Sequence, residues 1–164
     1  DPTVPPKPEP TAVAASPDEA APQPAFTIEA VHAHLKDGNR MKAIREYREL
    51  HGKLALNATK MGVEVEQEKL GMPSTMDVHK LYFAGKKEEA LTALAALYKK
   101  PADSDGIQRL WSDLEKIGPA TEERMKTHAA AGQSTAALAI YHHLHPETPI
   151  PEAWKAVQVL MGRD

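Results

Sequence analysis

The sequence predicts an all-α fold, and two observations support this prediction. From Phe26 onward the apolar residues recur with the 3.6-residue period of a helix, and the one alternating piece, "GVEVEQE" at 62–68, is short and lies within helical sequence. One pattern also occurs three times: a glycine, four residues, an alanine, and then apolar residues one, four and seven positions after the alanine. Its glycines are Gly38, Gly85 and Gly132, and because 85 − 38 and 132 − 85 both equal 47, the copies are in register. The sequence therefore predicts tandem helical-hairpin repeats of 47 residues.

A unit of this length has room for three helices, which gives about nine helices in three units at about 26–72, 73–118 and 119–164. In the first unit, Thr27 can cap a helix that ends at Gly38. Asn39 can cap a second helix, and a third is expected from about 53 to 69. Short polar side chains suit the first position because their oxygen accepts a hydrogen bond from a free backbone N–H.

The second unit shows the same signals more clearly. Ser74, followed three residues later by Asp77, resembles a capping box with the shorter acid. The helix that starts there is expected to end at Gly85. The next helix is expected to run to Lys100, just before a proline, and the third to end near Gly118.

In the third unit, Pro119 occupies a place that is typical of the first turn of a helix, and Gly132 would end that helix. A second helix is expected over 134–145. Thr148, with prolines close behind it, marks the start of the last helix.

The small residue that recurs in the second helix of each unit is Ala43, Ala90 or Ala137. An alanine at a fixed position on an amphipathic helix lets two helix axes approach closely, while the larger apolar residues around it form the buried stripe. We therefore interpret these alanines as packing residues.

The segment 1–25 has a different composition, with eight of the fourteen prolines and almost no large apolar side chain. Such a segment cannot bury enough surface to offset its chain entropy. We predict a disordered Pro/Ala-rich linker at 1–25 and a helical-repeat domain at 26–164. A proline-rich docking ligand is the alternative, because "PPKP" loosely fits grooves lined with aromatic residues.

Composition and charge argue against several classes of function. Without a cysteine the chain has no disulfide and no thiolate zinc site. Its formal charge of −3, with no basic face, makes a nucleic-acid partner unexpected. No apolar run approaches the roughly 18 residues that span a bilayer, so no membrane span is expected in this chain.

The recurring glycine–alanine–leucine pattern resembles the second helix of the tetratricopeptide (TPR) helix-turn-helix unit. That resemblance implies an α-solenoid that binds proteins. The period differs, because tetratricopeptide units are about 34 residues long, whereas 47 residues leave room for a third helix, as in armadillo or HEAT repeats.

Two further resemblances concern shorter segments. "AALAIYHHL" followed by "AWKAVQVLM" looks like the C-terminal helical domain shared by the COPII outer-coat subunit and the steroid receptor RNA activator protein, although the basic residues of its last helix are missing here. "AIREYRELHG" is similar to a helix of the ribosomal stalk protein's C-terminal domain, whose strands have no counterpart in this chain. Neither resemblance implies a particular ligand.

The segment "YHHLHP" is the one cluster that could carry chemistry. His142 and His145 are three residues apart on a predicted helix and share a face, which suits two imidazoles on one metal ion, but a third ligand would have to come from another helix. There is no glycine-rich phosphate loop, nucleophile elbow or paired-carboxylate motif. We expect no enzyme activity and no cofactor, and interpret the histidines as solvent-facing or as stabilising the helix C-terminus.

Stacked helical hairpins form a groove that can hold a peptide or a helix. We therefore expect a non-enzymatic interaction module, an adaptor or scaffold with a protein or peptide partner. The alternatives are a structural subunit that assembles with itself or a larger complex, and a metal-binding protein that uses the histidine-rich helix.

Adjacent aromatic residues predict where the partner binds. Tyr82 and Phe83 are neighbours on one helix, and successive helical positions are about 100° apart, so both seldom face the core. We expect Tyr82 or Phe83, with Tyr98 on the following helix, to border the groove. Burial of both rings between repeats is the alternative.

Overall fold

The computed structural model describes residues 25–163, which contain nine helices and no strand. The predicted all-α fold is confirmed. The helices are α2 (Ile28–Lys36), α3 (Arg40–Leu50), α4 (Leu56–Lys69), α5 (Thr75–Phe83), α6 (Lys87–Tyr98), α7 (Asp105–Ile117), α8 (Glu122–Ala130), α9 (Ser134–Leu144) and α10 (Ile150–Leu160). None of these described helices is long and apolar enough to cross a membrane. The linker predicted at 1–25 lies, apart from Ala25, outside the described residues.

The helices follow one another in three triplets, α2–α4, α5–α7 and α8–α10. The first helices begin at residues 28, 75 and 122, and the second helices at 40, 87 and 134. The differences 75 − 28, 122 − 75, 87 − 40 and 134 − 87 all equal 47. The third helices begin at 56, 105 and 150, so they keep the order but not the interval.

Within each triplet the first two helices pack together across a tight connection. The glycines in these connections are Gly38, Gly85 and Gly132, whose φ values are +76°, +82° and +78°. A side chain with a Cβ is strained at such angles, which explains why glycine recurs there. The helices expected to end at these glycines end two positions before them, at Lys36, Phe83 and Ala130.

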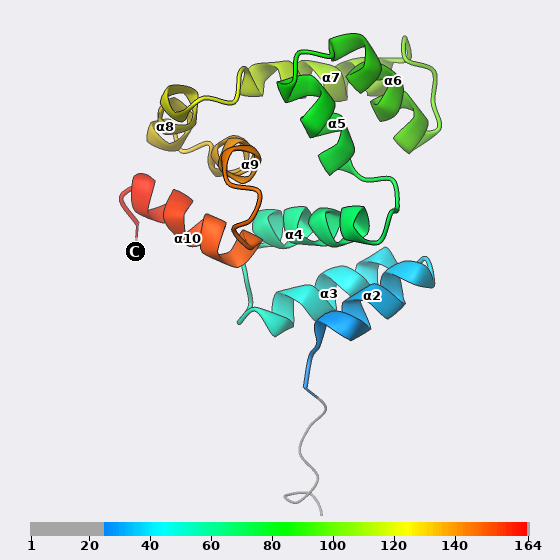
Figure 1. Cartoon of the computed structure of the whole chain (residues 1–164), viewed down its shortest axis with the longest axis vertical. Helices are drawn as coiled ribbons and strands as arrows, with labels where there is room; N and C mark the ends of the chain where they lie inside the picture. Colours follow the sequence, from blue (N-terminus) through cyan, green and yellow to red (C-terminus); the bar gives the residue numbers. More distant parts are fainter. Residues whose placement is uncertain (1–24, 164) are drawn as a thin grey trace, which may run out of the picture.

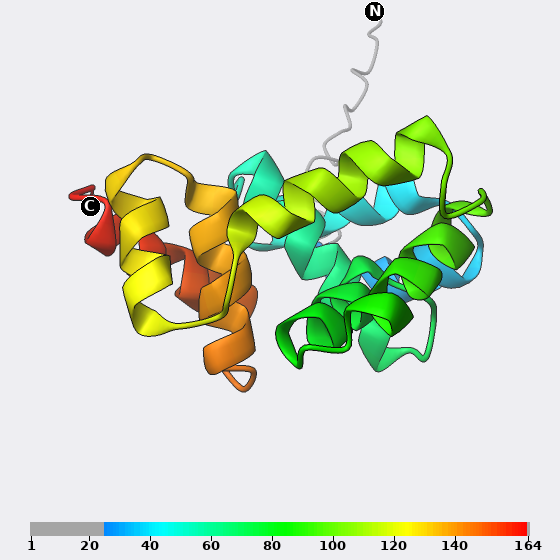
Figure 2. The ribbon, with the colours of Figure 1, turned by 90° about the horizontal axis from the view of Figure 1, so that it is seen from above.

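The triplets are arranged around α4, which lies between α2–α3 on one side and α5 on the other (Figure 1). The last helix, α10, also packs against α4, so the first and third triplets touch directly. In a simple linear array each repeat contacts only its neighbours. The chain therefore folds back on itself, and Figure 2 shows α7 leading from the second triplet to the third.

Two hydrophobic cores divide the molecule unequally. The first joins the first and third triplets, and its fully buried side chains include Val31, Val63, Leu138, Ile140 and Val157. The second lies within α5–α7 and consists of Val78, Tyr82, Ala90, Leu94, Ile107 and Leu114. Only a few apolar side chains join the cores: Met76 of α5 belongs to the first core, and Phe83 and Ile117 pack against both.

Three of the differences from the predicted helix boundaries have a clear cause in the backbone. The helix expected from residue 53 begins at Leu56, because Gly52 and Lys53 both have positive φ and turn the chain first. The second helix of the middle triplet ends at Tyr98, because Lys99 adopts a left-handed conformation. Pro119 does not lie in the first turn of a helix: α8 begins at Glu122, and the Pro119 carbonyl accepts a hydrogen bond from the Thr121 N–H in a turn.

Side chains of α8 hold the C-terminal end of α7. Arg124 donates from Nε to the Ile117 carbonyl and from Nη2 to the Lys116 carbonyl, each at 2.9 Å. The Nε2 atom of buried His128 lies 2.7 Å from the Ile117 carbonyl oxygen, and because a carbonyl only accepts, this nitrogen carries the proton. These contacts satisfy carbonyls that a helix end leaves without partners, and so fix the join between the second and third triplets.

The capping box predicted at Ser74 is present. The Ser74 hydroxyl accepts a hydrogen bond from the Met76 N–H, and Asp77 Oδ2 accepts one from the Ser74 N–H. We expect Ser74→Ala to lower the free energy of unfolding by about 1 kcal/mol, because a buried helix N-terminus loses its acceptor. Urea unfolding measures this effect. Thr121→Ala at the exposed cap of α8 is the comparison, and an equal or greater loss there would contradict the importance of burial at Ser74.

Candidate functional site

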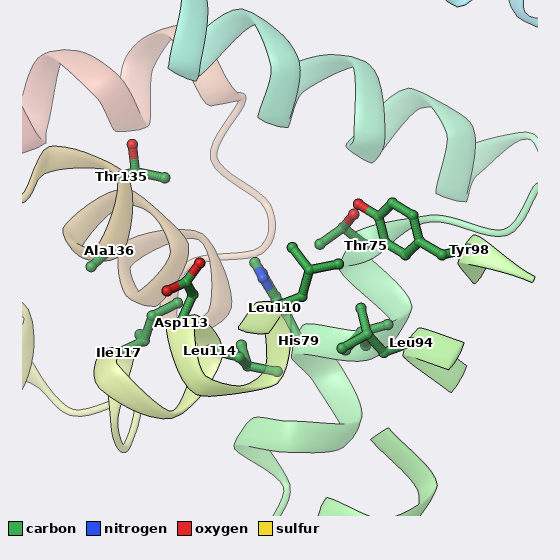
Figure 3. Close-up of a pocket in the computed structure, with 11 residues that line it drawn as sticks. Thr75, His79, Leu94, Tyr98, Leu110, Asp113, Leu114, Ile117, Thr135 and Ala136 are labelled. Carbon is green, nitrogen blue, oxygen red and sulfur yellow. The ribbon is translucent and has the colours of Figure 1, made fainter. Parts of the chain in front are cut away.

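An apolar cavity of about 310 Å³ opens between α5, α6, α7 and the start of α9. Tyr98 and Thr75 lie at one end of it, and Asp113, Ile117 and Ala136 lie toward the other (Figure 3). The remaining lining residues are Val78, His79, Leu94, Leu110, Leu114 and Thr135.

A second cavity of about 310 Å³ continues the first toward α3 and α4. The two share four lining residues, Thr75, His79, Tyr98 and Thr135. The second cavity adds Arg40, Asn57, Lys60, Met61, Glu64 and Met76. We call the two cavities together the groove. Helices from all three triplets line it, and it lies along the boundary between the two hydrophobic cores.

The apolar floor of the groove comes largely from α7. Leu110, Leu114 and Ile117 recur at the spacing of one helix face, and Leu114 also belongs to the second core. Leu110 and Ile117 are only partly buried. The apolar face of α7 is therefore wider than the second core covers, and the uncovered part forms the floor.

The two ends of the groove carry opposite charges. Asp113 lies at the α7 end, where its side chain is 65% exposed and its Oδ1 atom is 3.8 Å from Nζ of Lys116. Lys60 and Arg40 lie at the α3–α4 end, where Arg40 pairs with Glu64 at 2.6 Å. The groove therefore has an apolar floor on α7, an acidic residue at the α7 end and basic residues at the α3–α4 end.

The residues predicted to border the groove lie in different environments. Tyr98 is 47% exposed and lines both cavities of the groove. Tyr82 is 7% exposed and packs edge-on against Trp111 in the second core, with ring centroids 5.6 Å apart. Phe83 is partly buried between the two cores and does not line the groove. Only Tyr98 of the three is therefore placed at the groove.

The three histidines of "YHHLHP" also lie in two different places. His145 points to α8, with Nε2 at 3.9 Å from Glu122 Oε2, and its ring lies 4.7 Å from that of Tyr141. His142 and His143 instead line a cavity of about 240 Å³ between α9 and α5, together with His79. Within residues 25–163 no group of three or more histidine or acidic side chains is arranged to hold a metal ion. The third ligand that a site at His142 and His145 would need is not brought to them.

His79 is the residue that links these cavities. It lines both cavities of the groove and the cavity that holds His142 and His143. Burial, with a smaller contribution from the charges of His142 and His143, lowers the pKa of His79 to about 4. At neutral pH the groove therefore has an uncharged imidazole at its centre.

The sequence offered partial signals for this site. Leu110, Leu114 and Ile117 stand out as an apolar stripe, but a stripe does not show which part of it stays uncovered. Nothing in the sequence distinguishes His79 from the other histidines, because His142 and His143, its partners on α9, are more than 60 residues away along the chain.

Comparison with family models, curated proteins and solved structures finds no match to this chain.

Proposed function

We propose that the protein is a non-enzymatic interaction module whose groove binds an amphipathic helix of a partner protein. The supporting observation is the groove itself: an apolar, open channel with a floor of leucine and isoleucine side chains, bordered by helices of all three triplets. Helices that enter such channels place apolar side chains at every third or fourth position on the floor. An exposed aromatic ring beside the floor, as at Tyr98, is a typical anchor in such interfaces.

The charges at the two ends define the partner further. Asp113 favours a basic residue on the bound helix, and Lys60 favours an acidic one at the opposite end, where Arg40 is already paired with Glu64. Such charges mainly set orientation and the association rate. The proposed ligand is therefore a helix with an apolar stripe, one basic end and one acidic end.

The three triplets are, on this proposal, copies of one 47-residue unit. The equal spacing of the first two helices supports this, as do the positive φ of the three junction glycines and the complete burial of Ala43, Ala90 and Ala137. The third helices diverge because they occupy different places in the fold. Helix α4 is central, α7 forms the groove floor, and α10 packs back on α4. The groove then arises where the copies meet.

A display library of helical peptides, randomised at positions i, i+3, i+4 and i+7 and at both ends, tests the function directly. We expect selection on the purified protein to enrich peptides with large apolar residues on one face. Leu110→Arg should weaken the binding of a selected peptide at least tenfold, because it places a charge on the groove floor. Titration calorimetry measures the affinity.

Ser112→Arg is the matched control, since Ser112 lies on the same helix, is exposed and does not line the groove. Circular dichroism verifies that both variants are folded. The assignment is wrong if selection enriches no peptide or if both variants bind the peptide alike. It is also wrong if light scattering shows an obligate oligomer that Leu110→Arg dissociates.

A further inference from the structure

The boundary between the two hydrophobic cores is weakly packed. Apolar contact across it comes from Met76 of α5, which belongs to the first core, and from Phe83 and Ile117, which pack against both cores. The two cavities of the groove and the cavity around His142 and His143 all lie along this boundary. A close-packed interior has few such voids. The α5–α7 triplet is therefore a body with its own core, attached to the rest through a limited surface.

Three histidines lie in this attachment. The ring of Phe83 is 5.9 Å from that of His79 on its own helix and 4.9 Å from that of His143 on α9. His142 lines the same cavity, and its Nδ1 atom is buried without a hydrogen-bond partner within the described residues. The contact between α5 and α9 therefore includes an aromatic ring and three imidazoles beside Met76 and Ala139, and a charge on any of these imidazoles would be costly to bury without a partner.

Few charges on neighbouring helices can compensate protons taken up there. On the groove side, His79 is faced by Asp113 of α7, and by Arg40, Lys60 and Glu64 of α3 and α4. Glu64 already pairs with Arg40, and Asp113 lies largely in solvent near Lys116. The groove side therefore supplies no free buried carboxylate to His79.

On the α4 side, too, the carboxylates near the histidines are already paired or exposed. Lys80 of α5 faces both His142 and His143, and Glu68 and Lys69 of α4 also face His142. Glu68 attracts a proton on His142, but it already pairs with Lys80. Across the neighbouring cavity His142 also faces His51, Glu66 and Glu147. Glu66 is engaged by His32 at 2.7 Å and by Lys69 at 3.1 Å, and Glu147 is exposed. New positive charge in this contact would therefore be repelled by Lys80 and by the other imidazoles, and Glu68 is, among residues 25–163, the one carboxylate that opposes this repulsion at His142.

We propose that uptake of protons by His79, His142 and His143 separates the α5–α7 triplet from α9 while both hydrophobic cores stay folded. The separation widens the groove, because α5–α7 and α9 form its opposite sides. If the groove binds a helix as proposed above, acidification releases that helix. The separation itself does not depend on a ligand.

The direction of the pH effect follows from the histidine pKa values. Burial, with the neighbouring imidazoles, lowers the pKa of His79 to about 4, and burial is also the main cause that lowers the pKa values of His142 and His143. After separation the rings meet water, and their pKa values return toward about 6.5. Between about pH 6.5 and pH 4 the separated form therefore binds more protons, so falling pH favours it, and the attachment is fully stable only above this range.

Energy transfer between two dyes tests the proposal on the full chain. The chain has no cysteine, so cysteines introduced at exposed Thr92 on α6 and exposed Lys155 on α10 carry the dyes, one on each side of the boundary. We expect transfer efficiency to change between pH 7 and pH 4, with a midpoint inside the range given above, while far-UV circular dichroism keeps its helical signal.

In the variant His79→Gln, His142→Gln, His143→Gln the midpoint should fall by at least one pH unit or disappear. If this variant does not fold, His143→Gln alone, at a half-buried ring, should lower the midpoint. His34→Gln with His145→Gln is the control and should leave the midpoint unchanged, because both rings lie outside the contact. Constant transfer across the pH range, loss of helix at the same pH, or an unchanged midpoint in the boundary variants would overturn the proposal. None of these results depends on a peptide ligand, so they do not bear on the proposed function.

Discussion

Gly62→Ala is expected to lower the free energy of unfolding by about 2 kcal/mol, although alanine is the better helix former. Gly62 is buried in α4, and a Cβ added there would overlap Cε1 and Cζ of Tyr47. The Tyr47 ring is 3% exposed and belongs to the first core, so it has little room to move away. Overpacking of this kind costs up to about 3 kcal/mol, which outweighs the roughly 1 kcal/mol gained from helix propensity.

Gly106→Ala is the matched control, because Gly106 is also helical but its nearest neighbour would be Lys100 Nζ, at 3.8 Å. Chemical denaturation should show a lower free energy of unfolding for Gly62→Ala and an equal or higher one for Gly106→Ala. A double-mutant cycle with Tyr47→Leu should recover most of the loss at Gly62. A stabilising effect of Gly62→Ala would show that Tyr47 does not pack on α4 in this way.

Ala90→Leu should destabilise the protein by about 3 kcal/mol, because Ala90 is fully buried in the second core and the added methylenes have no space. Thr92→Leu on the same helix is the control, since Thr92 is exposed and its replacement should change stability by less than about 0.5 kcal/mol. Thermal unfolding followed by circular dichroism measures both. Equal stability of the two variants would contradict the role of Ala90 as a close helix contact.

The sequence predicted local features well. The helix caps at Thr27, Asn39 and Ser74 all form, since each depends on a side chain and a backbone N–H a few residues away. Pro119 was misplaced, because Gly118 and Pro119 together make a turn that delays the start of α8 until after Thr121.

Features that depend on distant parts of the chain were not predictable. The sequence left open whether Tyr82 and Phe83 are both buried. No local pattern shows that Trp111 packs on Tyr82 or that His143 packs on Phe83. Tyr98 does line the groove, since it is the last residue of α6 and is not part of the second core.

The packing of α10 on α4 also affects how the chain folds during synthesis. The α5–α7 core contains only residues that lie close together in sequence, so it can form as soon as that segment has left the ribosome. The first core requires α8–α10, which are made after α5–α7, and until they arrive the apolar faces of α2–α4 remain without their partners. We therefore expect α5–α7 to reach their native structure before α2–α4, although α2–α4 are made first.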